Sequence, residues 1–291
     1  MQAQQLLMVC QTFAGPGVIQ AYPTSLLSAA RIFLRYRGLL WELTKRDFAG
    51  RYKGSFLGLA WSLFNPLLML SIYTFVFGVA FKARWGTPSE DSNANFAIVL
   101  FSGLIIHGLF AECLVRSPTL ITSNVNYVKK VVFPLEILPL VSLGSALGHF
   151  LVSLVVLIAF CAIVGTGLHS SGILLPIVLL PMLLIVVGLS WFFASLGVYL
   201  RDFAQVIGIV STILLFLAPI FYPISSLPPV YQKLLIFNPI TLPVVQVRGL
   251  LLWGERINWG AWAISMVVGL AVFNLGFVWF QKTRKGFADV L

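Results

Sequence analysis

The sequence is poor in charged residues. Only 10% of its 291 residues are Asp, Glu, Lys or Arg, whereas soluble proteins contain about a quarter. Hydrophobic residues make up 59% of the chain, and the mean hydropathy is +0.97. A lipid bilayer penalises unpaired charges and so removes them from membrane-spanning segments. The composition excludes a soluble domain and predicts an all-α membrane protein with one transmembrane domain.

Side chains that catalyse reactions or bind metals are also scarce. The chain has three histidines and three cysteines, and none stands at a spacing typical of a metal site, a disulfide framework or an acid/base pair. A phosphate-binding loop of the form GxxxxGKS/T is missing as well. The sequence therefore predicts no catalytic residue, no metal and no cofactor on this chain.

Six apolar stretches are long enough to cross a bilayer. Crossing about 30 Å of hydrocarbon takes roughly 20 residues of helix, because backbone groups in lipid must be hydrogen-bonded internally. Glu112 is the main ionisable residue inside these stretches, which weakens a proton-coupled mechanism. The predicted spans are residues 57–81, 96–115, 137–164, 173–200, 203–221 and 257–280.

The distribution of lysine and arginine predicts the orientation. Basic residues stay preferentially on the cytoplasmic side of a membrane. Placing the N-terminus inside puts 14 basic residues in cytoplasmic segments and 5 in outer segments. The net charge of +10 therefore marks topology and not a nucleic-acid partner, and both termini are expected in the cytoplasm of an inner-membrane protein.

An amphipathic helix is predicted at residues 28–50, after a flexible lead-in at residues 1–27. Cationic side chains recur there at helical spacing, and large apolar side chains occupy another face. Glu42 and Arg46 could pair one turn apart. Such a helix would lie in the headgroup layer with its cations toward anionic lipid, and a plain anchoring helix is the alternative.

Residues 222–254 are too apolar for a free loop but contain five prolines, which exclude one continuous helix. Two short apolar pieces around a proline break suit a re-entrant hairpin that dips into the outer leaflet. The alternative is a loop that lies flat on the membrane.

Several motifs carry a family resemblance. The run RYKGSFLGLAW at residues 51–61 is followed by Asn65 and Pro66, and VKKVVFPLEILP occupies residues 128–139. The sequence NPIT at residues 238–241, Arg248 and the closing GFADVL extend the likeness. From about Ser28 onward the chain resembles the membrane subunits of bacterial polysaccharide exporters of the type-2 ABC group, which serve O-antigen, capsule and teichoic acid export.

This resemblance implies a homodimer of the present chain with two copies of a separate cytoplasmic ATPase, which would bind ATP and Mg²⁺. The implied cargo is a polysaccharide linked to polyprenyl diphosphate, with O-antigen favoured, carried from cytoplasm to periplasm. One alternative keeps the ABC architecture but carries a drug or a simple lipid. Another is a membrane-bound glycosyl- or acyltransferase, which would need clustered acids, or a histidine with a carboxylate, at one membrane face.

The loop at residues 117–136 is the longest cytoplasmic segment between spans, and we expect it to hold the helix that couples to the ATPase. Pro134 and Pro139 would end that helix and set its angle to the third span. The alternative is that its basic residues only enforce topology. The residues expected in coupling are Val128, Lys129, Lys130, Phe133, Pro134 and Glu136.

A diphosphate headgroup needs cations at the cytoplasmic membrane surface, and Arg46, Arg51 and Lys53 stand at that depth. Gly50, Gly54 and Gly58 would share one helical face there, which would allow close approach of a ligand. The alternative is that these cations only hold the first span in register.

A sugar polymer needs a wet path lined by aromatic faces, although most aromatics in a membrane protein face lipid or pack between helices. The candidate channel residues are Trp61, Phe64, Tyr73, Phe77, Phe216, Phe221 and Tyr222. The candidate outer-gate residues are Asn238, Pro239 and Arg248.

Overall fold

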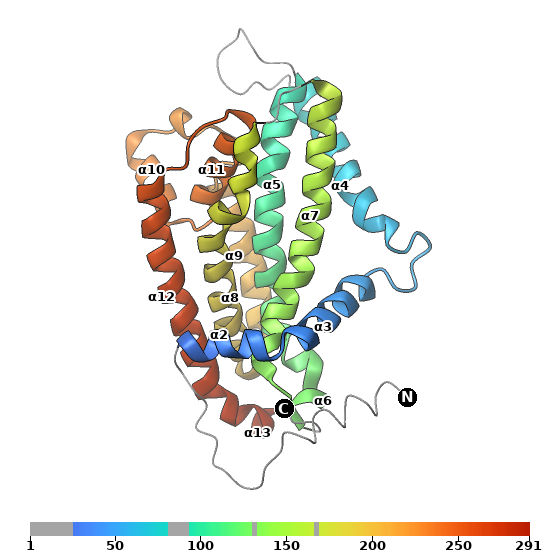
Figure 1. Ribbon diagram of the computed structural model, residues 1–291, viewed down its shortest axis with the longest axis vertical. Helices are drawn as coiled ribbons and strands as arrows, with labels where there is room; N and C mark the ends of the chain where they lie inside the picture. Colours follow the sequence, from blue (N-terminus) through green and yellow to red (C-terminus); the bar gives the residue numbers. More distant parts are fainter. Residues whose placement is uncertain (1–25, 81–92, 130–132, 166–168) are drawn as a thin grey trace.

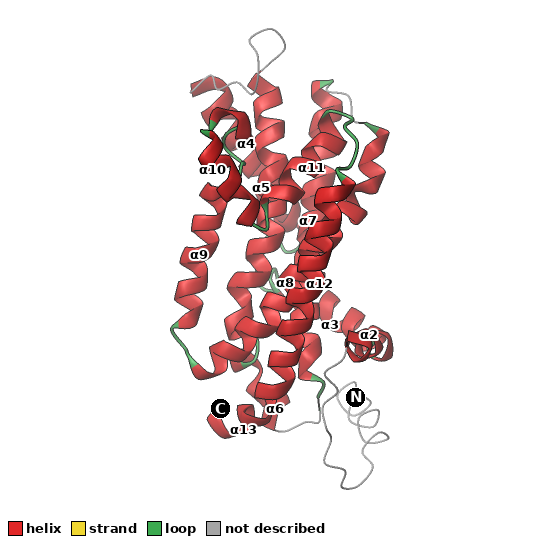
Figure 2. Ribbon diagram, turned by 90° about the vertical axis from the view of Figure 1, so that its left-hand side faces the viewer, coloured by secondary structure: helices red, strands yellow, loops and turns green. Residues whose placement is uncertain are grey.

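The structure, a computed structural model, describes residues 26–80, 93–129, 133–165 and 169–291. The predicted lead-in at residues 1–27 lies almost entirely outside these ranges. The described residues form helices and no strands (Figures 1 and 2). Most of the long helices run along one axis of the molecule. The expectation of an all-α membrane protein is confirmed.

Five helical segments in the described ranges are long and apolar enough to span a membrane. The predicted spans at residues 57–81, 96–115, 137–164, 173–200 and 257–280 each overlap one of them. The helices concerned are α4 (Ala60–Tyr73, continued by the π-helical η1, Thr74–Ala80), α5 (Asn93–Arg116), α7 (Leu138–Val164), α8 (Leu175–Tyr199, preceded by η5, Ser170–Leu174) and α12 (Trp259–Thr283).

The remaining predicted span, residues 203–221, is shorter as a helix. It forms α9 (Phe203–Leu217), whose 15 residues extend about 22 Å at the usual rise per residue. The helix ends because Ala218 is extended and Pro219 follows it, and a proline cannot supply the next backbone donor.

Helix α5 lies at the centre of the bundle. About two thirds of its apolar window is buried, against 11% for α4. Helices α8 and α12 also pack closely: a Cβ on Gly276 would meet the backbone of Gly188, and a Cβ on Gly188 would meet the backbone of Val272 and Phe273. Small residues at this crossing let the two helices approach closely, which is a common source of stability between membrane helices.

Replacing Gly276 by alanine is therefore expected to destabilise the protein by about 2 kcal/mol, the usual cost of overpacking a close contact. Thermal unfolding of the detergent-solubilised protein measures this as a drop of roughly 4–8 °C. The control is Gly38→Ala, because nothing lies within 4 Å of a Cβ added there. An unchanged melting temperature for Gly276→Ala would contradict the close packing of α8 and α12.

Two helices, α2 (Leu26–Arg35) and α3 (Arg37–Gly50), lie across the bundle and not along it (Figure 1). They correspond to the predicted helix at residues 28–50, divided at Tyr36. Phe33 and Trp41 are largely exposed, as expected of a helix in the headgroup layer. Phe48, in contrast, turns inward and stacks on His149 at 4.7 Å between ring centroids.

The link from α3 to α4 is a series of turns at residues 51–59. Gly54 and Gly58 have φ angles of 87° and 52°, in the left-handed region that favours glycine. The expectation that Gly50, Gly54 and Gly58 share a helical face was therefore wrong. Gly54 and Gly58 reverse the chain between the crossing helix and the first span.

The connection between α5 and α7 is not one long helix. It consists of η2 (Ser117–Thr119), η3 (Thr122–Asn124), α6 (Val125–Lys129) and η4 (Leu135–Ile137), with residues 130–132 outside the described ranges. Pro139 lies in the first turn of α7, where its missing N–H costs no hydrogen bond. It therefore helps to begin the next span, whereas we had expected it to end a coupling helix.

The segment at residues 222–254 forms a bent helix pair, as the proline pattern predicts. Its parts are η6 (Ile224–Ser226), α10 (Pro229–Leu234), η7 (Leu235–Phe237) and α11 (Thr241–Leu252), with a bend of 99° between Phe237 and Thr241. We call the end of the bundle that carries α10 and α11 the hairpin end. The opposite end carries α6 and the C-terminal turns η8 (Arg284–Gly286) and α13 (Phe287–Val290), and we call it the basic end (Figure 1).

Candidate functional site

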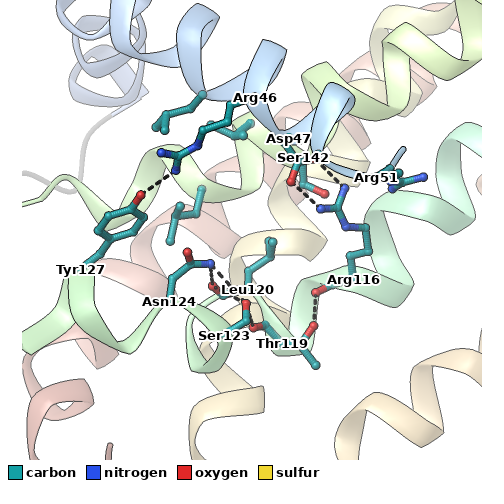
Figure 3. Close-up of a pocket in the computed structure, with 14 residues that line it drawn as sticks. Arg46, Asp47, Arg51, Arg116, Thr119, Leu120, Ser123, Asn124, Tyr127 and Ser142 are labelled. Atoms are coloured by element: carbon teal, nitrogen blue, oxygen red, sulfur yellow. Dashed lines mark hydrogen bonds and ion pairs between the residues drawn. The ribbon is translucent and has the colours of Figure 1, made fainter. Parts of the chain in front are cut away.

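A cavity of about 500 Å³ opens at the basic end, between α3, the end of α5, the following connection and the start of α7 (Figure 3). We call it the arginine pocket. It is lined by Leu43, Arg46, Asp47, Gly50, Arg51, Arg116, Thr119, Leu120, Ser123, Asn124, Tyr127, Leu138, Val141 and Ser142. Three guanidinium groups and one carboxylate thus share the lining with several hydroxyl and amide groups.

Arg46 is the cation most available to a ligand. Its Nη2 donates to the Tyr127 hydroxyl at 2.8 Å, and no carboxylate of the described residues pairs with it. The expected pairing of Glu42 with Arg46 was wrong, because Glu42 instead pairs with Lys45 at 3.1 Å on the exposed side of α3. Arg46 is therefore free to turn into the pocket (Figure 3).

Arg116 is held differently. Its two terminal nitrogens donate to the two carboxylate oxygens of Asp47 at 2.9 and 2.7 Å, a bidentate arrangement that fixes α3 to the end of α5. Burial alone would raise the pKa of Asp47, but the hydrogen bonds and the charge of Arg116 outweigh it and hold that pKa below its usual value of 3.8. This ion pair forms part of the pocket lining and fixes the two helices that carry it.

Arg51 belongs to a third group beside the pocket. Its Nη2 donates to Glu112 at 2.5 Å, and His149 Nδ1 lies 3.1 Å from the same carboxylate. The sequence pattern suggested that no histidine has such a carboxylate partner, and this was wrong because the two residues are 37 positions apart. Phe48 covers the imidazole ring, and neither Glu112 nor His149 lines the cavity.

Ser142 adds a polar group without a partner. Its side chain is 1% exposed, it lines the pocket, and its Oγ has no hydrogen-bond partner among the described residues. A buried hydroxyl left unsatisfied is costly, so a ligand or water that enters the pocket would gain from bonding to it. The pocket is thus suited to a small, polar, anionic group.

The two predicted headgroup residues Arg46 and Arg51 both line this pocket, whereas Lys53 does not. Lys53 is exposed and follows the end of α3, where the turns before Gly54 lead the chain away. Arg116, Asp47 and Tyr127 were not predicted. Arg116 and Tyr127 reach Asp47 and Arg46 on α3 across separations of 69 and 81 residues, which no local pattern reveals.

The ion pair between Asp47 and Arg116 has a pH dependence that can be measured. Because the folded-state pKa of Asp47 lies below its unfolded value of 3.8, the pair stabilises the protein above that value and loses its effect as the pH falls through the folded pKa. Asp47→Asn is therefore expected to lower stability by about 1 kcal/mol at pH 7, and thermal unfolding should show the difference shrinking below about pH 4. An equal difference at pH 7 and pH 3.5 would contradict the ion pair.

The predicted coupling residues fall into two groups. Lys129 is exposed, and Val128 and Pro134 are partly exposed at the basic end, while Lys130 lies outside the described residues. The other two point inward. Phe133 is 8% exposed and stacks on Tyr127 at 4.4 Å, and Glu136 is 7% exposed and bonds to Arg284. These two hold the connection in place and do not offer their side chains to a partner.

The predicted channel aromatics form two clusters. Trp61 and Phe64 are in edge contact at 5.4 Å on exposed positions of α4. Toward the hairpin end, Phe77 links span one to the end of α9, with ring centroids 6.4 Å from Phe221. The same cluster contains Tyr73, 6.5 Å from Phe77, and Phe216, stacked 5.5 Å from Phe221, while the hydroxyl of Tyr222 donates to the Phe216 carbonyl.

The predicted gate residues fasten the hairpin to the bundle. Asn238 stands at the bend, where its amide donates to the Leu214 carbonyl at 3.1 Å and its Oδ1 accepts from the Ile240 N–H. Pro239 is partly exposed beside it. Arg248 is 2% exposed and donates to three backbone carbonyls. They belong to Val99 at 3.0 Å, Pro219 at 2.5 Å and Ile220 at 3.0 Å.

Comparison with known proteins gives consistent matches. The model of the family "ABC-2 type transporter" matches residues 38–252. An O-antigen export system permease protein RfbA of Klebsiella pneumoniae is 28% identical over 254 residues, which is 87% of this chain and 95% of that protein. The RfbA permease of Myxococcus xanthus is 27% identical over 271 residues, 91% of this chain and 99% of that protein. With the family match covering well over half of its length, this chain belongs to the ABC-2 type transporter family of membrane proteins.

Proposed function

We propose that this chain is the membrane-spanning permease subunit of an ATP-driven exporter that carries a polysaccharide linked to polyprenyl diphosphate from cytoplasm to periplasm. O-antigen is the cargo we favour, because the relatives in Klebsiella pneumoniae and Myxococcus xanthus are named for its export. The observation that carries the proposal is the arginine pocket at the basic end of a family member.

The chemistry of the pocket suits a diphosphate. Arg46 offers a guanidinium whose described partner is a neutral hydroxyl, and a phosphate oxygen would bind it more strongly than tyrosine does. Arg51 and Arg116 add positive charge while their carboxylate partners keep the site folded. The Ser142 hydroxyl lies buried in the wall and can donate to a further oxygen.

We infer from the distribution of basic residues that this pocket faces the cytoplasm. The basic end carries α2 and α3, the end of α5 with the connection after it, and the end of α12 with the C-terminal turns. The described residues of these segments include 10 of the 19 lysines and arginines. Such segments stay preferentially in the cytoplasm, so both termini face it, in the inner membrane. The exposed apolar side chains of α2 and α3 would then rest in the inner leaflet beside the pocket mouth, where a lipid-linked substrate arrives.

The complete exporter would contain two copies of this chain and two copies of a cytoplasmic ABC ATPase, which would hold ATP and Mg²⁺. Helix α4 supports the need for a second copy, because only 11% of its apolar window is buried. Asn65 on α4 is exposed, and an amide in contact with lipid tails is unfavourable. In a dimer, this side chain would contact the second copy, or water in the glycan path between the two copies.

One contact in the structure is consistent with the transferase alternative, but the surroundings of that contact favour the exporter. It requires a histidine with a carboxylate at one membrane face, and His149 with Glu112 meets that description. However, Phe48 stacks on the His149 imidazole, and Arg51 donates a hydrogen bond to the Glu112 carboxylate. Both groups are therefore already engaged by neighbouring side chains. Neither His149 nor Glu112 lines the arginine pocket.

Reconstitution tests the proposal. The permease, co-expressed with its ATPase and placed in liposomes, should hydrolyse ATP faster when the polyprenyl-diphosphate-linked glycan is added. The free glycan without its lipid diphosphate should have little effect. Equal stimulation by a simple phospholipid would favour the exporter of simple lipids, and no stimulation by the lipid-linked glycan would argue against the proposal.

A further inference from the structure

The C-terminal segment of the chain is bound firmly to the connection between α5 and α7. Arg284, in the first C-terminal turn, donates from Nη1 to the Glu136 carboxylate at 2.5 Å and from Nη2 to the Phe133 carbonyl at 3.0 Å. The side chains of this ion pair are only 15% and 9% exposed. Residues 148 positions apart are thus joined by a mostly buried charge pair.

Hydrophobic packing holds the same segment from its other side. Phe287 is fully buried, with its ring 5.6 Å from Phe280 and 6.2 Å from Tyr199. The Tyr199 hydroxyl donates to the Thr283 carbonyl at 3.1 Å. The final turns therefore contact α8, α12 and the connection, and they are part of the folded domain.

The outer surface of this unit is basic and lies at the tip of the molecule. Helices α13 and α6 are in contact, and both stand at the basic end (Figure 1). Lys129, Lys282 and Lys285 are exposed there, and so are Ala288, Asp289 and Val290 on α13. The surface thus combines three cations with one carboxylate and two small apolar side chains.

We propose that residues 284–291 form, with the connection after α5, one surface on which the ATPase subunit docks. The inference rests on the proposed function, because it needs that subunit as the partner. The ATPase would present carboxylates to the exposed lysines and an apolar contact to α13.

The position of Glu136 explains how the two parts of this surface would act together. The connection ends with η4, which leads directly into α7, and from α8 the Trp191 indole donates to the Glu136 carbonyl at 2.9 Å. The C-terminal turns continue directly from α12. A force applied to the shared surface would therefore reach α7, α8 and α12 at once, instead of α7 alone.

Charge reversal across the ion pair gives a sharp test in the complete permease–ATPase complex. Glu136→Arg and Arg284→Glu each leave a like-charge pair at a mostly buried site. Each variant should reduce two signals at least fivefold. The first is the amount of ATPase that co-purifies with the permease, and the second is the ATP hydrolysis that the permease stimulates. The double variant with both reversals should recover at least half of each signal. Arg256→Glu, an exposed arginine at the hairpin end, is the matched control and should change neither signal.

A second measurement avoids variants that fail to fold. A photo-crosslinking amino acid at the exposed position of Ala288 should attach the ATPase subunit in the intact complex, and one at Trp259 on the hairpin end should not. Crosslinks from position 288 to lipid alone would overturn the inference, as would single charge reversals that bind and stimulate the ATPase normally. If the unaltered permease recruits no ATPase at all, the proposed function itself fails. If it recruits the ATPase without contact at position 288, only this inference fails.

Discussion

Replacing Arg46 by glutamate is expected to reduce export of the lipid-linked glycan about a hundredfold while the permease remains folded and inserted. A charge-assisted hydrogen bond contributes about 1.5–3 kcal/mol, and repulsion of a diphosphate by the new carboxylate adds to that loss. A total of about 2.8 kcal/mol corresponds to a hundredfold change in affinity. Arg46 bonds only to the Tyr127 hydroxyl among its described neighbours, so the fold should tolerate the change.

Lys45 provides the control for this experiment. It precedes Arg46 on α3, but it pairs with Glu42 on the exposed side and does not line the pocket. Lys45→Glu makes the same charge change one residue away and should leave export within about twofold of the unaltered protein, as expected for an exposed pair. Surface display of the glycan measures both variants. Equal loss of export in the two variants would mean that total charge matters and the pocket does not.

Replacing Arg248 by methionine is expected to destabilise the protein by at least about 3 kcal/mol. Methionine fills much of the same volume but leaves the carbonyls of Val99, Pro219 and Ile220 without their donor in a buried site. Each unsatisfied buried acceptor costs about 1–3 kcal/mol. The melting temperature in detergent should fall by roughly 6–12 °C, and the hairpin at residues 222–254 should become accessible to protease at the hairpin end.

Arg256→Met is the matched control for Arg248→Met. Arg256 lies beyond the end of the same helix, is exposed, and forms no ion pair with the described residues. Its replacement should shift the melting temperature by less than about 2 °C, as is usual for surface substitutions. If Arg248→Met melts like the control and resists protease equally well, Arg248 does not anchor the hairpin.

Much of the fold can be predicted from the sequence, because backbone groups in lipid must form hydrogen bonds within the protein. Long apolar runs must be helices, and each predicted span overlaps a helix. The prolines around Pro239 correctly indicated a bent pair at residues 222–254. The turns were harder to predict. Gly54 and Gly58 were given a helical role, but their positive φ angles reverse the chain.

The candidate site was only partly predictable. Arg46 and Arg51 were chosen for their depth at the membrane surface, and they do line one pocket. The partners that shape this pocket come from distant spans. Tyr127 lies 81 residues from Arg46, and Glu112 lies 61 residues from Arg51. One sequence carries no local signal for such contacts, so the ion pairs emerge only from the packed helices.

Glu136 shows the same limit in another form. Its position in the loop between two spans predicts a surface group that contacts a partner, yet its carboxylate bonds to Arg284, 148 residues further along the chain. A charged residue in a loop is usually exposed, and only a specific buried partner overrides that expectation. Glu136 therefore links the connection after α5 to the C-terminal turns through Arg284.

The most direct test of the account is to delete the gene in its own host cell and to measure the polyprenyl-diphosphate-linked glycan on each side of the inner membrane. We predict that the surface polysaccharide disappears while its complete lipid-linked precursor accumulates on the cytoplasmic side, and that the intact chain, but not Arg46→Glu, restores export. Loss of the surface polysaccharide with no accumulated precursor would contradict export as the function, because it would place the defect in synthesis.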